Sequence, residues 1–163
     1  MTSNKDVVLQ HTTARGMTKL EIDNFLSKPI IARLATVGNN LQPHVVPVWY
    51  LWKDESLWIT LDQTSKKYKN LLSNPRCAVT IDESLGGLRF MAVIMEGEAE
   101  IITGPKVAVL NQVIEIYTRY LGKEAVLCHT PQQMLTNGQH ALLKLKPEKI
   151  ISWDDTHGVA PVG

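Results

Sequence analysis

Short runs of β-branched and apolar residues, separated by turn-forming residues, dominate the chain and limit what it can fold into. "IIARLATV" at residues 30–37 is followed by "GNN", whose glycine and asparagines tolerate the positive φ of a tight hairpin turn. "QPHVVPVWYLW" at 42–52 follows, and a "KDES" turn leads to "LWITL" at 57–61. We therefore expect a three-stranded antiparallel meander over residues 31–61.

Further strands are expected on both sides of one long helix. "RCAVTID" and "FMAVIMEGEAEIIT" read as two strands, the second with a bulge or bend at Gly97. From Pro105 to Gly122 the apolar residues recur at helical spacing, which predicts a helix with its buried face at Val107, Leu110, Ile114, Tyr117 and Leu121. After a short turn at Thr130 and Pro131, "HALLKLKPEKIISW" predicts one or two strands, split around Pro147.

The N-terminal part begins with a loose arm over residues 1–16, which show no clear period. Thr18 and Glu21 then form a capping-box pattern that predicts the start of a helix, ending before Pro29. Its buried face would carry Ile22, Phe25 and Leu26. Many short strands in meander order with one late helix favour a closed or nearly closed antiparallel barrel over a parallel α/β sheet.

Composition predicts a single compact domain over residues 1–163, since 44% of the residues are hydrophobic and 20% are charged. The net charge of +1 gives no field that would gather the chain onto nucleic acid or an anionic membrane, so neither is an expected partner. No apolar run reaches the roughly 20 residues of a membrane-spanning helix and no signal-peptide core is present, which predicts a cytoplasmic protein. Cys77 and Cys128 form no metal-binding pair and are both expected to be buried.

A hydroxyl and lysine cluster marks the start of another helix, in "TLDQTSKKYKNLLSNP" at residues 60–75. Thr64 or Ser65 is the expected cap, and Tyr68, Leu71 and Leu72 the apolar face, before Asn74-Pro75 ends the helix. A helix start exposes unpaired backbone N–H groups, and Ser65, Lys66 and Lys67 add a hydroxyl and two ammonium groups that suit a phosphate dianion. An ordinary capped surface helix with solvated lysines explains the same residues.

Pro47 interrupts a strong strand pattern because proline cannot donate a ladder hydrogen bond. The position indicates an edge, a bulge or a place where a ligand meets the backbone. Trp49, Trp52 and Trp58 on the neighbouring runs are candidates for core or interface aromatics.

Five segments in this order resemble the FMN-binding split-barrel proteins related to pyridoxamine 5′-phosphate oxidase, particularly their flavin- and deazaflavin-dependent oxidoreductase branch. They are "ARLATVGNNLQPHVVPVWYLW", "LWITLDQTSKKYKNLLSNPRCAVTID", "VIMEGEAEII", "RYLG" and "LLKLKPEKIISW", covering roughly residues 18–154. The resemblance implies a mainly β fold with flanking helices (α+β), a six-stranded antiparallel split barrel. It also implies a homodimer with two equivalent flavin sites at the subunit interface.

The resemblance further implies which residues hold the flavin. Ser65, Lys66 and Lys67 would bind its phosphate and Thr60 would lie along the ribityl chain or ring. The isoalloxazine would be lined by Val46, Pro47, Val48 and Trp49, with Trp153 of the partner subunit as a further ring neighbour. The ending "ISWDDTHGVAPVG" departs from that of the pyridoxamine phosphate oxidases proper, so vitamin B6 oxidation is not expected.

The expected function is hydride transfer between bound FMN and a small organic substrate, with no nameable catalytic residue and no metal. The first alternative is a deazaflavin coenzyme in the same groove, whose polyglutamate tail would need further basic residues such as Lys53, Lys69 and Arg76. A second is a non-catalytic flavin or haem carrier, with His44, His129 or His140 as the axial ligand of a haem, although His44 is expected first of all to be a structural histidine. A third, single-stranded nucleic-acid binding through "KKYK", conflicts with the neutral overall charge.

Overall fold

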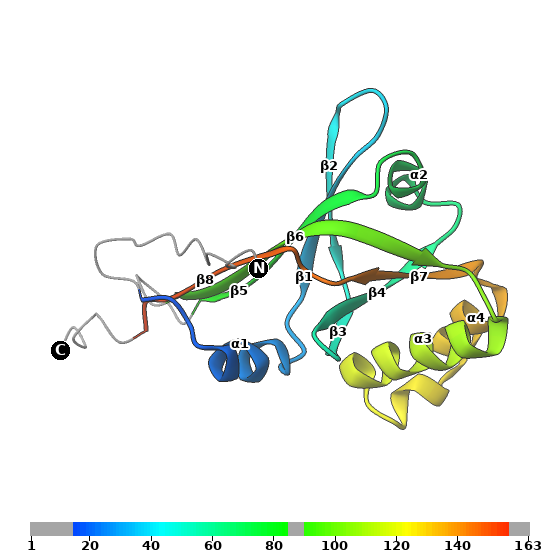
Figure 1. The fold of residues 1–163 in the computed structure, drawn as a ribbon. Helices are drawn as coiled ribbons and strands as arrows, with labels where there is room; N and C mark the ends of the chain where they lie inside the picture. Colours follow the sequence, from blue (N-terminus) through cyan, green and yellow to red (C-terminus); the bar gives the residue numbers. More distant parts are fainter. Residues whose placement is uncertain (1–14, 85–89, 157–163) are drawn as a thin grey trace.

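The computed structural model describes residues 15–84 and 90–156, which form an antiparallel sheet with helices on its flanks (Figure 1). The helices are α1 (Lys19–Leu26), α2 (Lys66–Ser73), α3 (Lys106–Leu121), the 3-10 turn η1 (Ala125–Leu127) and α4 (His129–Asn137). The strands are β1 (Ala32–Val37), β2 (Pro43–Val48), β3 (Tyr50–Lys53), β4 (Ser56–Asp62), β5 (Arg76–Ser84), β6 (Phe90–Ile102), β7 (His140–Leu145) and β8 (Lys149–Asp154). The expectation of a mainly β fold with α-helices is confirmed.

The long strand β6 is the centre of the sheet. The strand order is β2-β1-β5-β6-β7-β4-β3, and β8 pairs with β6 beside this path. The first half of β6 lies between β5 and β8, whereas Ala99–Ile102 pairs with β7, so β6 carries the chain from one part of the sheet to the other (Figure 1). The described residues contain eight strands, not the six expected, and the strand order does not close on itself.

The prediction of a three-stranded meander over residues 31–61 is wrong, because the strand breaks at Trp49. The run read as one strand is two, since β2 ends at Val48 and β3 begins at Tyr50. β2 pairs with β1 and β3 pairs with β4, at opposite ends of the strand order. The chain thus changes from one end of the sheet to the other across a single residue, and Trp49 lies at that change.

Gly97 lies in continuous strand and not at a bulge. The pairing of β5 with β6 runs without an inserted residue from Arg76↔Glu98 to Ser84↔Phe90. A Cβ atom at Gly97 would lie 3.2 Å from the backbone nitrogen of Glu148 and 3.2 Å from the Leu145 side chain. The glycine therefore permits a close approach of the β7–β8 connection.

α1 begins with the expected capping box. The Thr18 hydroxyl accepts from the Glu21 N–H and the Glu21 carboxylate accepts from the Thr18 N–H at 2.8 Å. Phe25 and Leu26 are buried and Ile22 is half-buried, which confirms the apolar face. The loose arm expected over residues 1–16 lies outside the described residues except for Arg15 and Gly16; the Arg15 carbonyl accepts from the Asp154 N–H at 3.0 Å.

The buried face of α3 differs from the expected one. Its buried residues are Val109, Val113, Ile116 and Tyr117, whereas Val107 is 71% exposed and Leu110 is 36% exposed. Only Tyr117 is common to the two sets. The helix carries apolar residues on almost every side, so the spacing alone admits both choices of face.

The segment after α3 contains η1 and α4, where the sequence predicted only a short turn. Pro131 is in the first turn of α4, where its missing N–H is not needed. The split of the C-terminal strands around Pro147 into β7 and β8 is confirmed.

Two hydrophobic clusters result. The larger one fills the interior of the curved sheet, with Leu34, Tyr50, Ile59, Val79 and Leu143 fully buried. The smaller one lies under α3 and α4, where Val113 and Ile116 pack with Leu142 of β7 and the half-buried Trp49 and Trp58. No helix among the described residues is long and apolar enough to cross a lipid bilayer.

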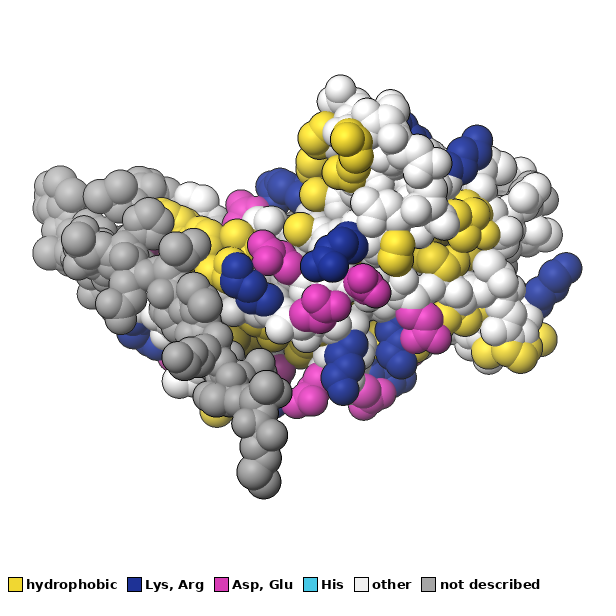
Figure 2. Space-filling model, turned by 45° about the horizontal axis from the view of Figure 1, so that its top comes forward, with side chains coloured by type: hydrophobic (Ala, Val, Ile, Leu, Met, Phe, Trp, Pro, Cys, Tyr) yellow, Lys and Arg dark blue, Asp and Glu magenta, His cyan; other side chains and the backbone are white. Residues whose placement is uncertain are grey.

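On the face of the molecule that Figure 2 shows, charged side chains of both signs are interspersed with hydrophobic ones. Three ion pairs join residues directly opposite each other on neighbouring strands: Arg76–Glu98, Lys144–Glu100 and Lys149–Glu96. Such cross-strand pairs favour the observed register.

Only one of the two cysteines is buried, contrary to expectation. Cys77 is buried in β5, and desolvation raises the pKa of its thiol to about 11. Cys128, in the turn before α4, is exposed.

Candidate functional site

The start of α2 is built as the sequence predicts. Ser65 is the cap: its hydroxyl accepts from the Tyr68 N–H at 3.4 Å and donates to the Asp62 carbonyl at 2.6 Å. Leu71 is buried, but Leu72 is 61% exposed, so the expected apolar face of α2 is narrower than predicted. The cap fixes the first turn of α2 directly beyond the end of β4.

The two lysines of the first turn differ in position. Lys66 is exposed, whereas Lys67 is partly buried and lines a cavity together with Thr60 at the end of β4. In the ranges 15–84 and 90–156, no carboxylate forms an ion pair with Lys66 or Lys67 within 4.0 Å. Lys67 is therefore available to a ligand anion.

This cavity, which we call the Trp49 cavity, has a volume of about 450 Å³, within the usual range for small-molecule sites. It brings together segments that are far apart in the sequence: the end of β2, the break before β3, the end of β4, α2, α3 and α4. The lining residues are Ile31, Pro47, Val48, Trp49, Thr60, Lys67, Tyr117 and Met134. Five of the nine residues expected at the flavin are among them.

The other expected site residues lie elsewhere. Val46 faces Leu34 across the β1–β2 ladder and packs against the larger hydrophobic cluster. Ser65 acts as the helix cap, and Lys66 is exposed and is not part of the cavity lining. Trp153 lies on β8, where its ring meets the Phe90 ring edge-on at 6.1 Å, and its expected contact is with the flavin of a partner subunit. Its buried indole N–H has no hydrogen-bond partner among the described residues.

Aromatic rings form one wall of the Trp49 cavity. The Trp49 indole stacks on Tyr120 and meets Tyr117 edge-on at 5.3 Å. Burial raises the pKa of Tyr117, and the charge of Asp62 raises it further, so this hydroxyl keeps its proton. The sequence marked Tyr117 only as a core residue of α3; its place in the cavity depends on the crossing of α3 over the β2–β3 break.

A second cavity of about 410 Å³, the Asp62 cavity, adjoins the first. The two share the lining residues Thr60, Lys67, Tyr117 and Met134. Asp62 and His140 line the second cavity but not the first. Hydrogen bonds from the Thr64 hydroxyl and N–H lower the pKa of Asp62, with smaller contributions from the nearby His140 and Lys67, so this carboxylate stays ionised near neutral pH.

The histidines considered as haem ligands are not grouped at the Trp49 cavity. His44 lies in β2 outside its lining, and its carbonyl accepts a long hydrogen bond from the Thr36 hydroxyl at 3.5 Å. His129 is exposed at the start of α4. His140 places its Nε2 3.0 Å from the Met134 carbonyl and thus donates to it. Within the described part of the chain, no group of three or more His, Cys, Asp or Glu residues is arranged to hold a metal ion.

The Trp49 cavity therefore has an aromatic and apolar end and a cationic end, joined by a threonine. Such a lining fits a ligand with a flat apolar ring system and an anionic tail. A family model described as pyridoxamine 5′-phosphate oxidase matches residues 18–154, which is most of the chain. The chain belongs to this family.

Several solved structures share this fold. The conserved hypothetical protein Rv2991 from Mycobacterium tuberculosis is 25% identical, with a TM-score of 0.78, and the match covers 94% of this chain and 95% of that one. An F420 reductase is 24% identical, with a TM-score of 0.61, over 78% of this chain and 94% of the other. A FAD-binding protein from Mesorhizobium loti is 23% identical, with a TM-score of 0.63, over 86% and 96%. No curated protein matches the chain.

Proposed function

We propose that this protein is an FMN-dependent oxidoreductase that binds its flavin in the Trp49 cavity and transfers a hydride to or from a small organic substrate. The observation that carries the proposal is that Pro47, Trp49, Thr60 and Lys67 line one cavity although they come from three separate segments of the chain, residues 47–49, β4 and α2. The resemblance to the flavin-binding family implies a flavin at these same four residues.

Each end of the cavity has a role in this proposal. Lys67 and the free N–H groups at the start of α2 bind the phosphate, because both present positive charge or donors to an anion. Trp49 and Pro47 present aromatic and apolar surface to the isoalloxazine ring. Thr60, between the two ends, offers a hydroxyl to the ribityl chain.

A second copy of the chain completes the site in this proposal. The β1–β2 hairpin projects beyond the rest of the sheet (Figure 1), and it exposes Leu41 at 77% and Val45 at 60%. Leu72 of α2 is a further exposed apolar side chain. Exposed apolar side chains on a projecting hairpin are typical of a protein interface, and a homodimer would bring Trp153 of the partner subunit to the flavin.

In the mechanism, bound FMN supplies the capacity to accept and donate a hydride. The chain's own residues hold and shield it: Lys67 neutralises the phosphate, and Trp49, stacked on Tyr120, excludes water from one side of the cavity. Tyr117 keeps a neutral hydroxyl at the boundary with the Asp62 cavity, where it is placed to donate a hydrogen bond to a substrate.

A deazaflavin coenzyme is the second candidate, favoured by the structural likeness to an F420 reductase. Lys67 suits the phosphate of either coenzyme, so the two proposals differ only in the group that the cavity selects. A haem carrier is less well supported, because the lining of the Trp49 cavity contains no histidine among the described residues.

The test is a titration of the purified, cofactor-free protein with FMN and, separately, with the deazaflavin coenzyme, followed by visible absorbance and fluorescence. Saturable FMN uptake together with anaerobic reduction of the bound flavin supports the proposal. Uptake of the deazaflavin alone would show that the protein uses the deazaflavin coenzyme in place of FMN. Uptake of neither overturns both.

A further inference from the structure

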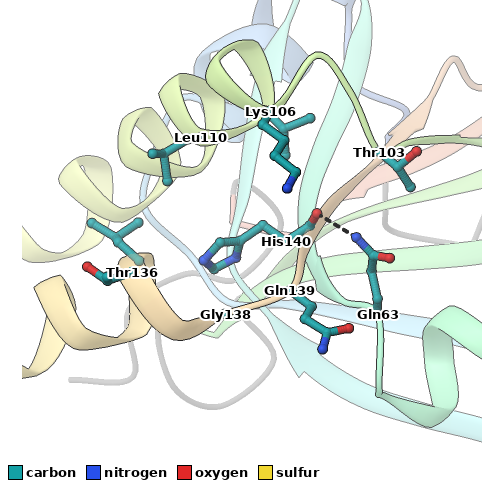
Figure 3. Close-up of a pocket in the computed structure, with 10 residues that line it drawn as sticks. Gln63, Thr103, Lys106, Leu110, Thr136, Gly138, Gln139 and His140 are labelled. Atoms are coloured by element: carbon teal, nitrogen blue, oxygen red, sulfur yellow. Dashed lines mark hydrogen bonds between the residues drawn. The ribbon is translucent and has the colours of Figure 1, made fainter.

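A third cavity, with a volume of about 500 Å³, lies between the start of α3, the end of α4 and the start of β7 (Figure 3). We call it the Lys106 cavity. Its ten lining residues are Gln63, Thr103, Lys106, Val109, Leu110, Leu135, Thr136, Gly138, Gln139 and His140. None of them is among the residues assigned to the flavin.

The lining of this cavity includes a positively charged side chain and no negatively charged one. Lys106 extends from the first turn of α3 into the space above His140 (Figure 3), and no acidic residue is part of the lining. In the described segments, no carboxylate forms an ion pair with Lys106 within 4.0 Å. Lys106 differs in this from Lys53, which pairs with Glu115, and from Lys149, which pairs with Glu96, so its ammonium group is open to an anionic ligand in the cavity.

Hydrogen bonds hold the polar wall in place. The Gln63 side chain donates to the His140 carbonyl at 3.0 Å, and the Gln63 N–H donates to the Gln139 carbonyl at 2.9 Å. The His140 ring is fixed by its hydrogen bond to the Met134 carbonyl. A Cβ atom at Gly138 would lie 2.5 Å from the His140 ring, so glycine is required for this close approach. The polar wall is thus preorganised.

The opposite wall is apolar. Val109 and Leu135 are buried and Leu110 is partly exposed at the cavity mouth. A cavity with one cation, several amide and hydroxyl groups and an aliphatic wall fits a small organic carboxylate with an apolar body.

We propose that the Lys106 cavity binds such an organic carboxylate. Gly138 and His140 line both this cavity and the Asp62 cavity, which shares Thr60 and Tyr117 with the Trp49 cavity. A carboxylate held at Lys106 therefore lies in a cavity that adjoins the proposed flavin cavity through the Asp62 cavity. That this ligand is the substrate rests on the proposed function; that it binds does not.

The test uses hexanoate and its neutral counterpart hexanamide as probes of the whole, cofactor-free protein, followed by amide chemical shifts in NMR spectra. Hexanoate is expected to shift the signals of Thr103, Lys106 and the 138–140 segment saturably, and hexanamide to bind more weakly. Lys106→Gln should weaken hexanoate binding by about fivefold without changing hexanamide binding. Lys123→Gln, an exposed lysine just beyond α3, is the matched control and should change neither.

Leu110→Ser is a second variant and should weaken both probes, because it removes the aliphatic wall. Equal binding of hexanoate and hexanamide, shifts confined to other segments, or an unchanged hexanoate affinity in Lys106→Gln would overturn the proposal. An FMN titration of the same samples separates the two ideas. Hexanoate binding without FMN uptake refutes the flavin function and leaves the carboxylate site standing, and FMN uptake without hexanoate binding does the reverse.

Discussion

The indole of Trp49 stacks on the ring of Tyr120, with the ring centroids 5.0 Å apart and the ring planes inclined by 6°. Tyr120 in turn donates from its hydroxyl to the Ile30 carbonyl at 2.7 Å and accepts from the Tyr50 N–H. The pair therefore fastens the break between β2 and β3 to α3 and to the start of β1. The position of the cavity wall depends on this contact.

Replacing Trp49 with leucine should weaken both folding and FMN binding. The substitution removes the stacked pair and part of the buried aromatic area, so the free energy of unfolding should fall by about 1 to 3 kcal/mol. Trp58→Leu is the matched control, because Trp58 is a half-buried tryptophan outside the Trp49 cavity. It should lower stability but leave FMN affinity unchanged. Urea unfolding and FMN titration of the two variants check this. Equal losses of FMN affinity in both would mean that the flavin ring does not lie against Trp49.

The buried face of α3 predicts a second pair of outcomes. Ile116→Ala should lower the free energy of unfolding by about 2 to 5 kcal/mol, because Ile116 is fully buried and its removal leaves a cavity. Leu110→Ala should cost less than about 1 kcal/mol, because Leu110 is partly exposed. Thermal or urea unfolding measures both. A larger loss for Leu110→Ala would restore the helix face expected from the sequence.

The two cysteines should differ in reactivity toward an aromatic disulfide reagent near about pH 8. Cys128 is exposed and should react quickly, whereas Cys77 is buried with the pKa of its thiol raised to about 11 and should react only when the protein unfolds. The expected result is one fast equivalent of thiol in the native protein and a second in denaturant. Loss of the fast phase in Cys128→Ser identifies the residue, and a fast phase that persists in that variant would contradict the burial of Cys77.

Glu21 makes the stability of the folded protein depend on pH through its contacts at the start of α1. Hydrogen bonds from Arg15 and from the Thr18 N–H and hydroxyl lower the pKa of Glu21 from 4.5 to about 2. Because the folded-state pKa is depressed, the stabilisation is present above pH 4.5 and is lost as the pH falls through about 2. Glu21→Gln should therefore be less stable than the parent near neutral pH, and the difference should shrink toward about pH 2. Unfolding curves across this range check it, and a difference independent of pH would rule out the carboxylate as its source.

The parts of the fold that the sequence predicted well are those with local signals. The cap at Thr18, a cap at Thr64 or Ser65 and the break at Pro147 follow from a few neighbouring residues, and the structure has all three, with Ser65 as the second cap. The break at Trp49 has no such signal, because "VPVWYLW" contains no turn residue after Pro47 and reads as continuous strand. Only the separate partners of β2 and β3 reveal it.

The candidate site likewise has residues that local sequence patterns indicate and residues that only the tertiary packing brings in. The segments that meet at the Trp49 cavity were recognisable as a family pattern, and Lys67, Thr60 and Pro47 are in its lining. Tyr117 and Met134 were missed as site residues because they come from α3 and α4, whose packing over the sheet is a tertiary feature. α4 itself was missed because "HTPQQMLTN" is mostly polar and has no apolar period.

The most direct test of the flavin site compares FMN with riboflavin, which lacks the phosphate, in the parent protein, in Lys67→Ala and in Lys69→Ala. Lys69 is an exposed lysine of the same helix and is not part of the cavity lining, which makes it the matched control. We expect the parent to prefer FMN, Lys67→Ala to weaken FMN binding by about 1 to 3 kcal/mol with little change for riboflavin, and Lys69→Ala to resemble the parent. Equal affinity of the parent for FMN and riboflavin, or an unchanged preference in Lys67→Ala, would contradict a phosphate site at the start of α2.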